Sequence, residues 1–331
     1  MTPPKNKFVQ RLLRMKGVRA TERFLKGIIL PGFAGLSLWQ VMKFFIEGIM
    51  KGGLGTRSAA ISFRIFLAFF PAIILLLSLI PHIPIPDFQQ GLFDSIRTFF
   101  PGDTFSLFES TLDDLINKKH NTLLSVGFIL VIYYASSSIN AILLGFSSSY
   151  HLEEKGNPLV LRIASIVLIF VLGFIMTLAV TIIVFSGSFF EFLHDKHIIG
   201  DKGYIPLLNF AKWIVSVALI YAVFSTLYYV GVGTRKRPWK FFNVGATFAT
   251  LFFVIASIVF AYFVNNFAQF NKLYGSLGTL MVLLIWLNFN CMILLLGFEL
   301  NLSIRKAKRH NAKPQIIPPT PEEPRNTLLT E

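Results

Sequence analysis

The chain has 331 residues, of which 54% are hydrophobic and only 15% are charged, whereas a soluble domain carries roughly 25% charged residues. This composition excludes an ordinary soluble domain, and the single cysteine, Cys291, excludes a disulfide framework and a cysteine-based zinc site. The net charge of +14 fits either nucleic acid or a membrane surface as a partner, and the positions of the charges decide between them.

The amino-terminal 30 residues combine eight Lys and Arg with one acid, Glu22, and apolar residues lie between the charges. Such a basic, weakly amphipathic segment suits an anionic cytoplasmic leaflet, so we expect membrane lipids as its partner and no nucleic acid. In residues 36–51, polar side chains recur every three or four positions and predict an amphipathic helix lying in the membrane plane. These side chains are Ser37, Gln40, Lys43, Glu47 and Lys51.

Six apolar segments are long enough to cross a bilayer, because about 20 helical residues cover ~30 Å of hydrocarbon. The predicted spans are 58–80, 122–146, 159–187, 207–231, 242–264 and 277–304. They form a membrane domain, 58–304, between a cytoplasmic amino terminus, 1–57, and a Pro-rich tail, 305–331, that we expect to be disordered.

The distribution of Lys and Arg predicts the orientation of the spans. With the amino terminus in the cytoplasm, the cytoplasmic segments 1–57, 147–158, 232–241 and 305–331 carry 22 basic residues. The outer segments 81–121, 188–206 and 265–276 carry six. Both termini are therefore expected in the cytoplasm.

The first outer loop, 81–121, is the one sizeable predicted segment outside the membrane. It holds two amphipathic helices, the first after Asp87 and the second after the turn at Pro101-Gly102-Asp103-Thr104. The predicted fold is thus an all-α integral membrane bundle of six transmembrane helices, with one amino-terminal in-plane helix and two amphipathic outer helices.

Two unusual residues interrupt the first span. Arg64 is a charge at membrane depth, which raises a functional question, and Pro71 predicts a helix kink. Arg64 lies seven residues after Arg57, and Glu299 lies six residues before Arg305, so both are expected near the cytoplasmic face. We therefore predict that Arg64 and Glu299 pair inside the bundle, either as a structural ion pair or as a gate or anion contact.

Other polar side chains within the spans leave two interpretations open. Ser137, Asn140, Asn288 and Asn290 either form interhelical hydrogen bonds or line a polar pathway. Asn288 and Asn290 are two residues apart, so they cannot both face one cavity. At the outer start of the last span, Tyr274-Gly275-Ser276 predicts a turn and a helix cap, and a helix amino terminus there could also attract an anionic group.

Several short motifs follow one another along the membrane domain: the run 59–71, Gly245-Ala246 after Pro238, Tyr274-Gly275-Ser276-Leu277, Trp286, and Gly297-Phe298-Glu299-Leu300-Asn301. In order and spacing they resemble the BrkB/YihY family of bacterial inner-membrane proteins over residues 35–305. The chain departs from that pattern at Arg64 and at Glu153-Glu154-Lys155, where the family has a basic cluster. The resemblance implies a location in the bacterial cytoplasmic membrane. The family carries the labels ribonuclease BN and virulence factor, and transport of lipid-like substrates has been suggested for some members.

The sequence does not support the ribonuclease label. Its one cluster of metal-binding residue types, Glu191, His194, Asp195 and His197, falls on an outer loop without the spacing of a familiar zinc motif. We expect no metal, no cofactor and no enzyme activity. The leading prediction is a transporter or flippase-like protein for an amphipathic or lipid-linked substrate. The alternative is a non-catalytic envelope scaffold that binds a protein partner, and either could form a homo-oligomer.

Overall fold

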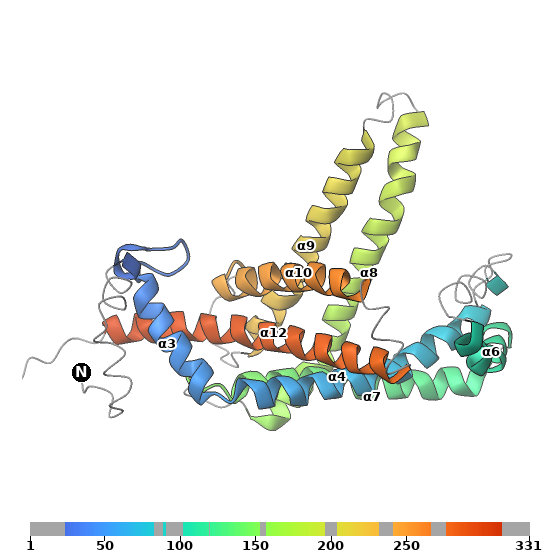
Figure 1. Ribbon diagram of the computed structural model, residues 1–331, viewed down its shortest axis with the longest axis horizontal. Coiled ribbons are helices and arrows are strands. Elements are labelled where there is room, and N and C mark those ends of the chain that lie inside the picture. The colour runs from blue at the N-terminus through green and yellow to red at the C-terminus, as the bar shows by residue number, and fades with distance from the viewer. Residues whose placement is uncertain are drawn as a thin grey trace, which may run out of the picture. The chain divides into compact units, whose positions relative to one another are not determined.

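The computed structural model describes residues 24–82, 89–90, 102–118, 120–152, 157–195, 204–231, 241–265 and 276–312. All the regular elements in these ranges are helices, which confirms the predicted all-α class (Figure 1). The chain divides into two compact units, residues 1–44 with 303–331 and residues 45–302.

Within the described residues, six helices are long and apolar enough to cross a membrane, as predicted. They are α4 (Leu54–Leu79), α7 (Asn121–Ser147), α8 (Pro158–Asp195), α9 (Tyr204–Gly231), α10 (Val244–Asn265) and α12 (Ser276–Ala312). Helices α8 and α12 are longer than the predicted spans 159–187 and 277–304, and the added turns at their carboxyl ends contain polar residues.

In the first unit, the chain enters α3 (Leu38–Lys51) through a reciprocal cap. The backbone N–H of Gln40 donates to Ser37 Oγ at 3.4 Å, and the backbone N–H of Ser37 donates to Gln40 Oε1 at 3.2 Å. This capping box satisfies two N–H groups that a helix start leaves without partners. The helix predicted over 36–51 is confirmed, and its position in the membrane plane stays a prediction.

In the second unit, Gly53 separates α3 from α4 with a φ of +59°, a left-handed conformation that glycine adopts without strain. Pro71 lies inside α4, and the helix continues on both sides of it. A short 3₁₀ turn, η1 (Ile80–His82), follows.

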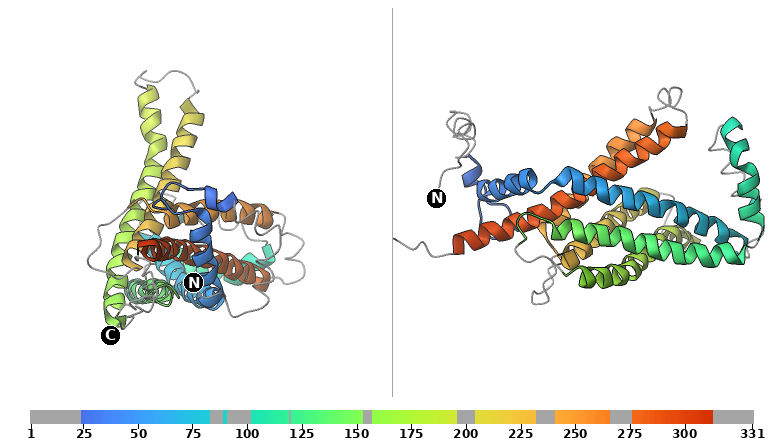
Figure 2. Two further views of the ribbon diagram at one scale, coloured as in Figure 1. Left: turned by 90° about the vertical axis from the view of Figure 1, so that its left-hand side faces the viewer. Right: turned by 90° about the horizontal axis from the view of Figure 1, so that it is seen from below.

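Helices α4 and α7 run side by side, α8 packs on α7, and α9 packs on α8 and α10 (Figures 1 and 2). Aromatic rings fill the core of this unit: Phe146 of α7 stacks on Phe298 of α12, with ring centroids 4.1 Å apart, and Tyr228 of α9 packs edge-on against Phe146. These contacts bring the end of α7 together with α9 and α12.

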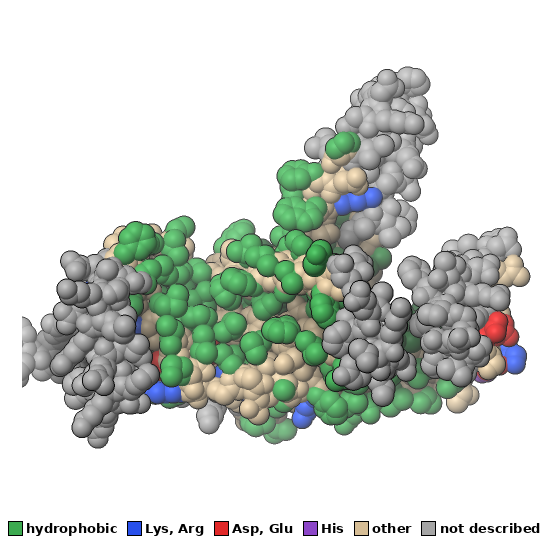
Figure 3. Space-filling model, viewed as in Figure 1, with side chains coloured by type: hydrophobic (Ala, Val, Ile, Leu, Met, Phe, Trp, Pro, Cys, Tyr) green, Lys and Arg blue, Asp and Glu red, His purple; other side chains and the backbone are tan. Residues whose placement is uncertain are grey.

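Little of each span is fully buried within the chain, since only 11–33% of its most apolar window is buried. Figure 3 shows hydrophobic side chains covering much of the described surface on the face viewed. Such a surface is unfavourable in water and suits a hydrocarbon environment.

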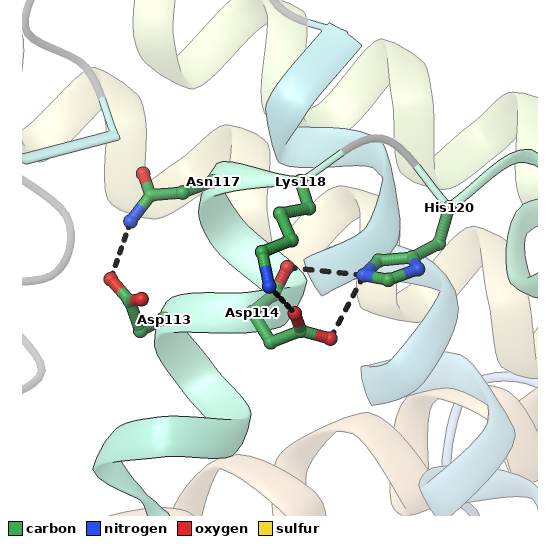
Figure 4. A network of polar contacts seen from close by, with 5 residues as sticks. All are labelled: Asp113, Asp114, Asn117, Lys118 and His120. Carbon is green, nitrogen blue, oxygen red and sulfur yellow. Dashed lines mark hydrogen bonds and ion pairs between the residues drawn. The ribbon is translucent and has the colours of Figure 1, made fainter.

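Helix α6 (Gly102–Asn117) corresponds to the second helix predicted in the outer loop. The first predicted helix lies outside the described residues except at 89–90. At the end of α6, Lys118 Nζ forms an ion pair with Asp114 Oδ1 at 2.6 Å, and His120 Nε2 lies 3.0 Å from Asp114 Oδ2 (Figure 4). The hydrogen bond from Lys118 lowers the pKa of Asp114. These contacts connect the last turn of α6 with the residues that lead into α7.

Candidate functional site

A buried acid, Glu299, lies where the start of α4, the end of α7 and α12 meet. Its side chain is 1% exposed, and Oε2 accepts a 2.5 Å hydrogen bond from Ser149 Oγ, just after the end of α7. A buried carboxylate requires such partners because its desolvation costs more than that of any neutral polar group.

Gly48 of α3 makes room for this carboxylate. A Cβ atom at position 48 would lie 2.8 Å from Cδ and 2.9 Å from Cγ of Glu299, closer than real side-chain contacts. Position 48 therefore admits glycine alone while Glu299 keeps its place. No partner for Glu299 on α3 was predicted from the sequence, where the available signal was Gly48 itself, a glycine within an otherwise bulky amphipathic helix.

Arg57 supplies the positive charge beside Glu299. Its Nη1 donates to the carbonyl oxygen of Gly145 at 2.7 Å, and the guanidinium interacts electrostatically with Glu299. Arg57 Nε and Nη2 are buried without a hydrogen-bond acceptor among the described residues. The cluster of Gly48, Arg57, Ser149 and Glu299 thus joins α3, α4, the end of α7 and α12 through one buried acid and one half-buried base.

The predicted pair of Arg64 and Glu299 is not formed among the described contacts. Arg64 is exposed, and its Nη1 donates to Ser137 Oγ at 3.1 Å. The prediction estimated depth from the sequence distances to Arg57 and Arg305, and such an estimate does not fix which residues of α4 and α12 lie level with each other. In the structure Arg57, seven residues before Arg64, stands beside Glu299 instead.

A second polar cluster joins α10 to α12. Asn301 Oδ1 accepts from the backbone N–H of Gly245 at 2.8 Å, and Asn301 Nδ2 donates to Asn243 Oδ1 at 2.8 Å. Asn243 Oδ1 also accepts from the backbone N–H of Ala246 at 2.8 Å, which caps α10. Asn243 was not singled out from the sequence, although an Asn just before an apolar run is a typical cap.

Glycines allow α10 and α12 to approach closely at this cluster. A Cβ on Gly297 would lie 2.6 Å from the carbonyl oxygen of Gly245 and would overlap the hydroxyl of Tyr228. That hydroxyl donates to the carbonyl oxygen of Leu294 at 2.8 Å. Close backbone approach at small residues is the usual way in which helices associate in lipid, where no hydrophobic force drives them together.

The other predicted polar residues do not come together in one described contact. Ser137 accepts from Arg64, and Asn290 Nδ2 donates to the Trp286 carbonyl oxygen of its own helix at 2.8 Å. The amide oxygens of Asn140, Asn288 and Asn290 are buried without a donor among the described residues. Both the packing interpretation and the pathway interpretation of these residues stay predictions.

Two further sites fall partly or wholly outside the described residues. Tyr274 and Gly275 lie outside them, and α12 begins at Ser276. The side chains of the cluster at 191–197 also lie outside them, although the backbone of 191–195 belongs to the end of α8 and not to a loop as predicted. Among the described side chains, no group of three or more His, Cys, Asp or Glu could hold a metal ion.

Three of the 31 basic residues lie inside the predicted spans, and they are Arg64, Arg162 and Lys212. Arg64 is exposed, whereas Arg162 and Lys212 are half-buried. The ion pairs of the described residues involve none of the three. A cation inside a span without a carboxylate partner is costly, which makes Arg64 and Arg162, whose side chains both contact α7, candidates for contact with an anion.

Comparison with known proteins identifies the relatives of this chain. The ribonuclease-like protein YfkH of Bacillus subtilis is 29% identical over 254 residues, which cover 77% of this chain and 91% of YfkH. A UPF0761 membrane protein of Haemophilus influenzae is 24% identical over 266 residues, covering 80% of this chain and 95% of the relative. A UPF0761 membrane protein of Aggregatibacter aphrophilus is 24% identical over 257 residues, covering 77% and 88%.

No solved structure matches the chain. The virulence factor BrkB family matches residues 45–320, which include all six candidate spans. The match also includes both polar clusters, with Gly48, Asn243, Glu299 and Asn301. The chain is a membrane protein that belongs to the virulence factor BrkB family.

Proposed function

We propose that this chain is a transporter or flippase-like protein that moves an amphipathic or lipid-linked substrate. The observation that carries the proposal is the exposed guanidinium of Arg64 within α4, which no described carboxylate neutralises. A cation at the bilayer centre costs ~2.5–3.5 kcal/mol, and less nearer the interface. An exposed charge within a span therefore favours an anionic partner at the membrane-facing surface.

The setting of Arg64 supports a defined position rather than a freely moving side chain. Ser137 of α7 accepts from its guanidinium at 3.1 Å. The next residue, Ser138, donates to the backbone carbonyl of Arg64 at 2.8 Å. Two consecutive serines of one helix thus hold both the side chain and the backbone of Arg64, at the contact between α4 and α7.

The charge distribution supports a location in the bacterial cytoplasmic membrane with both termini in the cytoplasm, because 22 basic residues fall on the proposed inner side and six on the outer side. In this orientation the basic amino terminus contacts anionic lipids of the inner leaflet. A non-enzymatic role is supported by the sequence, which offers no nucleophile–base pair at usable spacing.

The proposal is tested with purified protein in vesicles that carry a fluorescent phospholipid in both leaflets. Addition of the membrane-impermeant reductant dithionite quenches the outer leaflet first, and the rate of further quenching reports movement between leaflets. We expect the protein to accelerate this movement relative to protein-free vesicles, and Arg64→Gln to reduce it. The matched control, Lys43→Gln, removes an exposed positive charge from α3, outside the spans, and should leave the rate unchanged.

Vesicles in which the protein moves no lipid contradict the proposal. If such a protein also co-purifies with a fixed membrane partner, the scaffold alternative is favoured. A rate that falls equally in Arg64→Gln and Lys43→Gln contradicts the role given to Arg64, because loss of a positive charge outside the spans would then have the same effect as loss of the one inside α4.

A further inference from the structure

Two guanidinium groups flank one face of α7. Arg64, from α4, donates to Ser137 Oγ at 3.1 Å, and Arg162, from α8, lies with Cζ 5.9 Å from the ring centroid of Tyr133. Ser137 and Tyr133 are one helical turn apart, with Cβ atoms about 5–6 Å from each other on one side of the helix. Tyr133, which lies beneath Arg162, is 57% exposed.

Neither guanidinium takes part in an ion pair among the described residues, and the described hydrogen bonds use one N–H group of Arg64 and none of Arg162. The remaining N–H groups are free to meet an acceptor with several oxygens. Phosphate is the group that guanidinium recognises best, because two parallel N–H···O bonds match its geometry.

An apolar surface continues from these cations along all three helices. Leu67, Leu130 and Ile166 lie three or four residues from Arg64, Tyr133 and Arg162 respectively, so each shares a face with its polar neighbour. Their side chains are 37%, 40% and 41% exposed. On each helix the apolar residue lies further from the helix end that is nearer to its polar neighbour. The three apolar side chains therefore lie nearer the middle of the spans than Arg64, Tyr133 and Arg162.

We propose that Arg64 and Arg162 bind the phosphate of an anionic glycerophospholipid on this face of α7, with its acyl chains along Leu67, Leu130 and Ile166. The inference rests on the proposed function and names its substrate class. Free phosphate would gain nothing from the exposed apolar side chains beside the cations, so the arrangement favours a lipid. Arg64 lies seven residues after Arg57, so the bound phosphate would lie ~10 Å further along the helix than Arg57.

The proposal is tested by native mass spectrometry of the full chain released from mixed phosphatidylglycerol and phosphatidylcholine nanodiscs. We expect wild-type protein to retain phosphatidylglycerol in preference to phosphatidylcholine. Arg64→Gln and Arg162→Gln should each reduce this preference about ten-fold, which corresponds to ~1.4 kcal/mol. Lys212→Gln is the matched control, because it removes the third cation within the predicted spans, on α9, and should keep the preference.

Three results would overturn the proposal: a wild-type protein without preference for phosphatidylglycerol, an equal loss in Lys212→Gln, or displacement of the lipid by inorganic phosphate. The wild-type comparison and the phosphate competition need no variant, so they decide the question even if an arginine variant fails to fold. Arg64→Lys adds a further measurement, since it keeps the charge and loses the bidentate geometry, and it should bind phosphatidylglycerol more weakly than wild type.

Binding and movement of the lipid separate this inference from the proposed function. A protein that retains phosphatidylglycerol through Arg64 and Arg162 but moves no lipid between leaflets supports the site and contradicts the transporter. A protein that moves lipid with both arginines replaced supports the transporter and contradicts the site.

Discussion

The substitution Gly48→Ala tests the buried Glu299 cluster, because it adds a single methyl group where the carboxylate lies. The new Cβ would lie 2.8 Å from Cδ and 2.9 Å from Cγ of Glu299 and would overlap Oε1. The neighbouring atoms belong to a fully buried side chain, which cannot retreat into solvent. The carboxylate must therefore move away from Ser149, or α3 must move away from α12.

The size of the effect follows from two contributions. Overpacking a well-filled site costs about 1–3 kcal/mol. Loss of a hydrogen bond to a charged group costs about 1.5–3 kcal/mol. Because one displacement causes both, the contributions are only partly additive, and we expect the free energy of unfolding to fall by about 3 kcal/mol. At about 2–4 °C per kcal/mol, the midpoint of thermal unfolding should fall by roughly 6–12 °C.

Cys291 provides the assay. It is the single cysteine of the chain and is 3% exposed, so a thiol-reactive fluorescent dye labels it only when the core of α12 opens on heating. Gly173→Ala in α8 is the matched control, since a Cβ there meets nothing within 4 Å. The control should be neutral or slightly stabilising, because alanine favours a helix over glycine by up to about 1 kcal/mol.

Equal unfolding midpoints for Gly48→Ala and Gly173→Ala would refute the close contact between α3 and Glu299. A second variant tests the same reasoning from the other side. Glu299→Asp shortens the acid by one methylene group, so in the double variant with Gly48→Ala the loss should be smaller than the sum of the two single losses. Strict additivity would show that the two residues do not touch.

Three further predictions concern the α10–α12 contact and the end of α6. Gly297→Ala should lower the unfolding midpoint in the dye assay as much as Gly48→Ala does, because its Cβ overlaps the hydroxyl of Tyr228, and an unchanged midpoint would contradict the close approach. Asn301→Ala should cost about 1–3 kcal/mol, since an α10 backbone N–H loses its acceptor, and a wild-type midpoint would contradict that bond. The third prediction concerns Asp114→Asn. The hydrogen bond from Lys118 lowers the pKa of the Asp114 carboxyl, so the stability that this carboxylate contributes is present above the ordinary pKa of 3.8 and is lost as the pH falls through the lowered value. The difference in midpoint between Asp114→Asn and wild type should therefore be present at neutral pH and vanish in acid, and a difference independent of pH would contradict it.

Hydropathy was sufficient to locate the spans. Each predicted segment coincides with a helix of the structure, from α4 to α12, because a run of about 20 apolar residues has few alternatives to a membrane helix. The ends of α8 and α12 were predicted less well. Helix α12 continues through the basic residues 305–309 to Ala312, and hydropathy marks where lipid ends rather than where a helix ends.

The polar contacts could not be predicted because hydropathy does not fix how each span is rotated about its axis. In water an apolar stripe marks the buried face of a helix. In lipid the outward face is equally apolar, and no more than a third of each span's most apolar window is buried here. The predicted pairing of Arg64 with Glu299 therefore rests on depth alone, and the structure places Ser137 beside Arg64 and Ser149 beside Glu299.

Glycine and polar side chains carry the rotational information that hydropathy lacks, and the stretch 297–301 of α12 illustrates this. Gly297 and Asn301 are four residues apart, so they share one face, and both meet Gly245 of α10. Glu299 lies two residues from each, about 200° around the helix, and meets Gly48 and Ser149. One turn of α12 therefore makes two contacts on opposite faces without shared partners.

Independent contacts of this kind have an energetic consequence. The losses of unfolding free energy caused by substitutions at sites without shared partners usually add to within about 0.3–0.5 kcal/mol. The losses caused by Gly48→Ala and Gly297→Ala should therefore add in the double variant, whereas Gly297→Ala and Asn301→Ala, which share Gly245, should not. A strongly non-additive result for the first pair would mean that α12 responds as one rigid body, and that its two faces cannot be assigned separate roles.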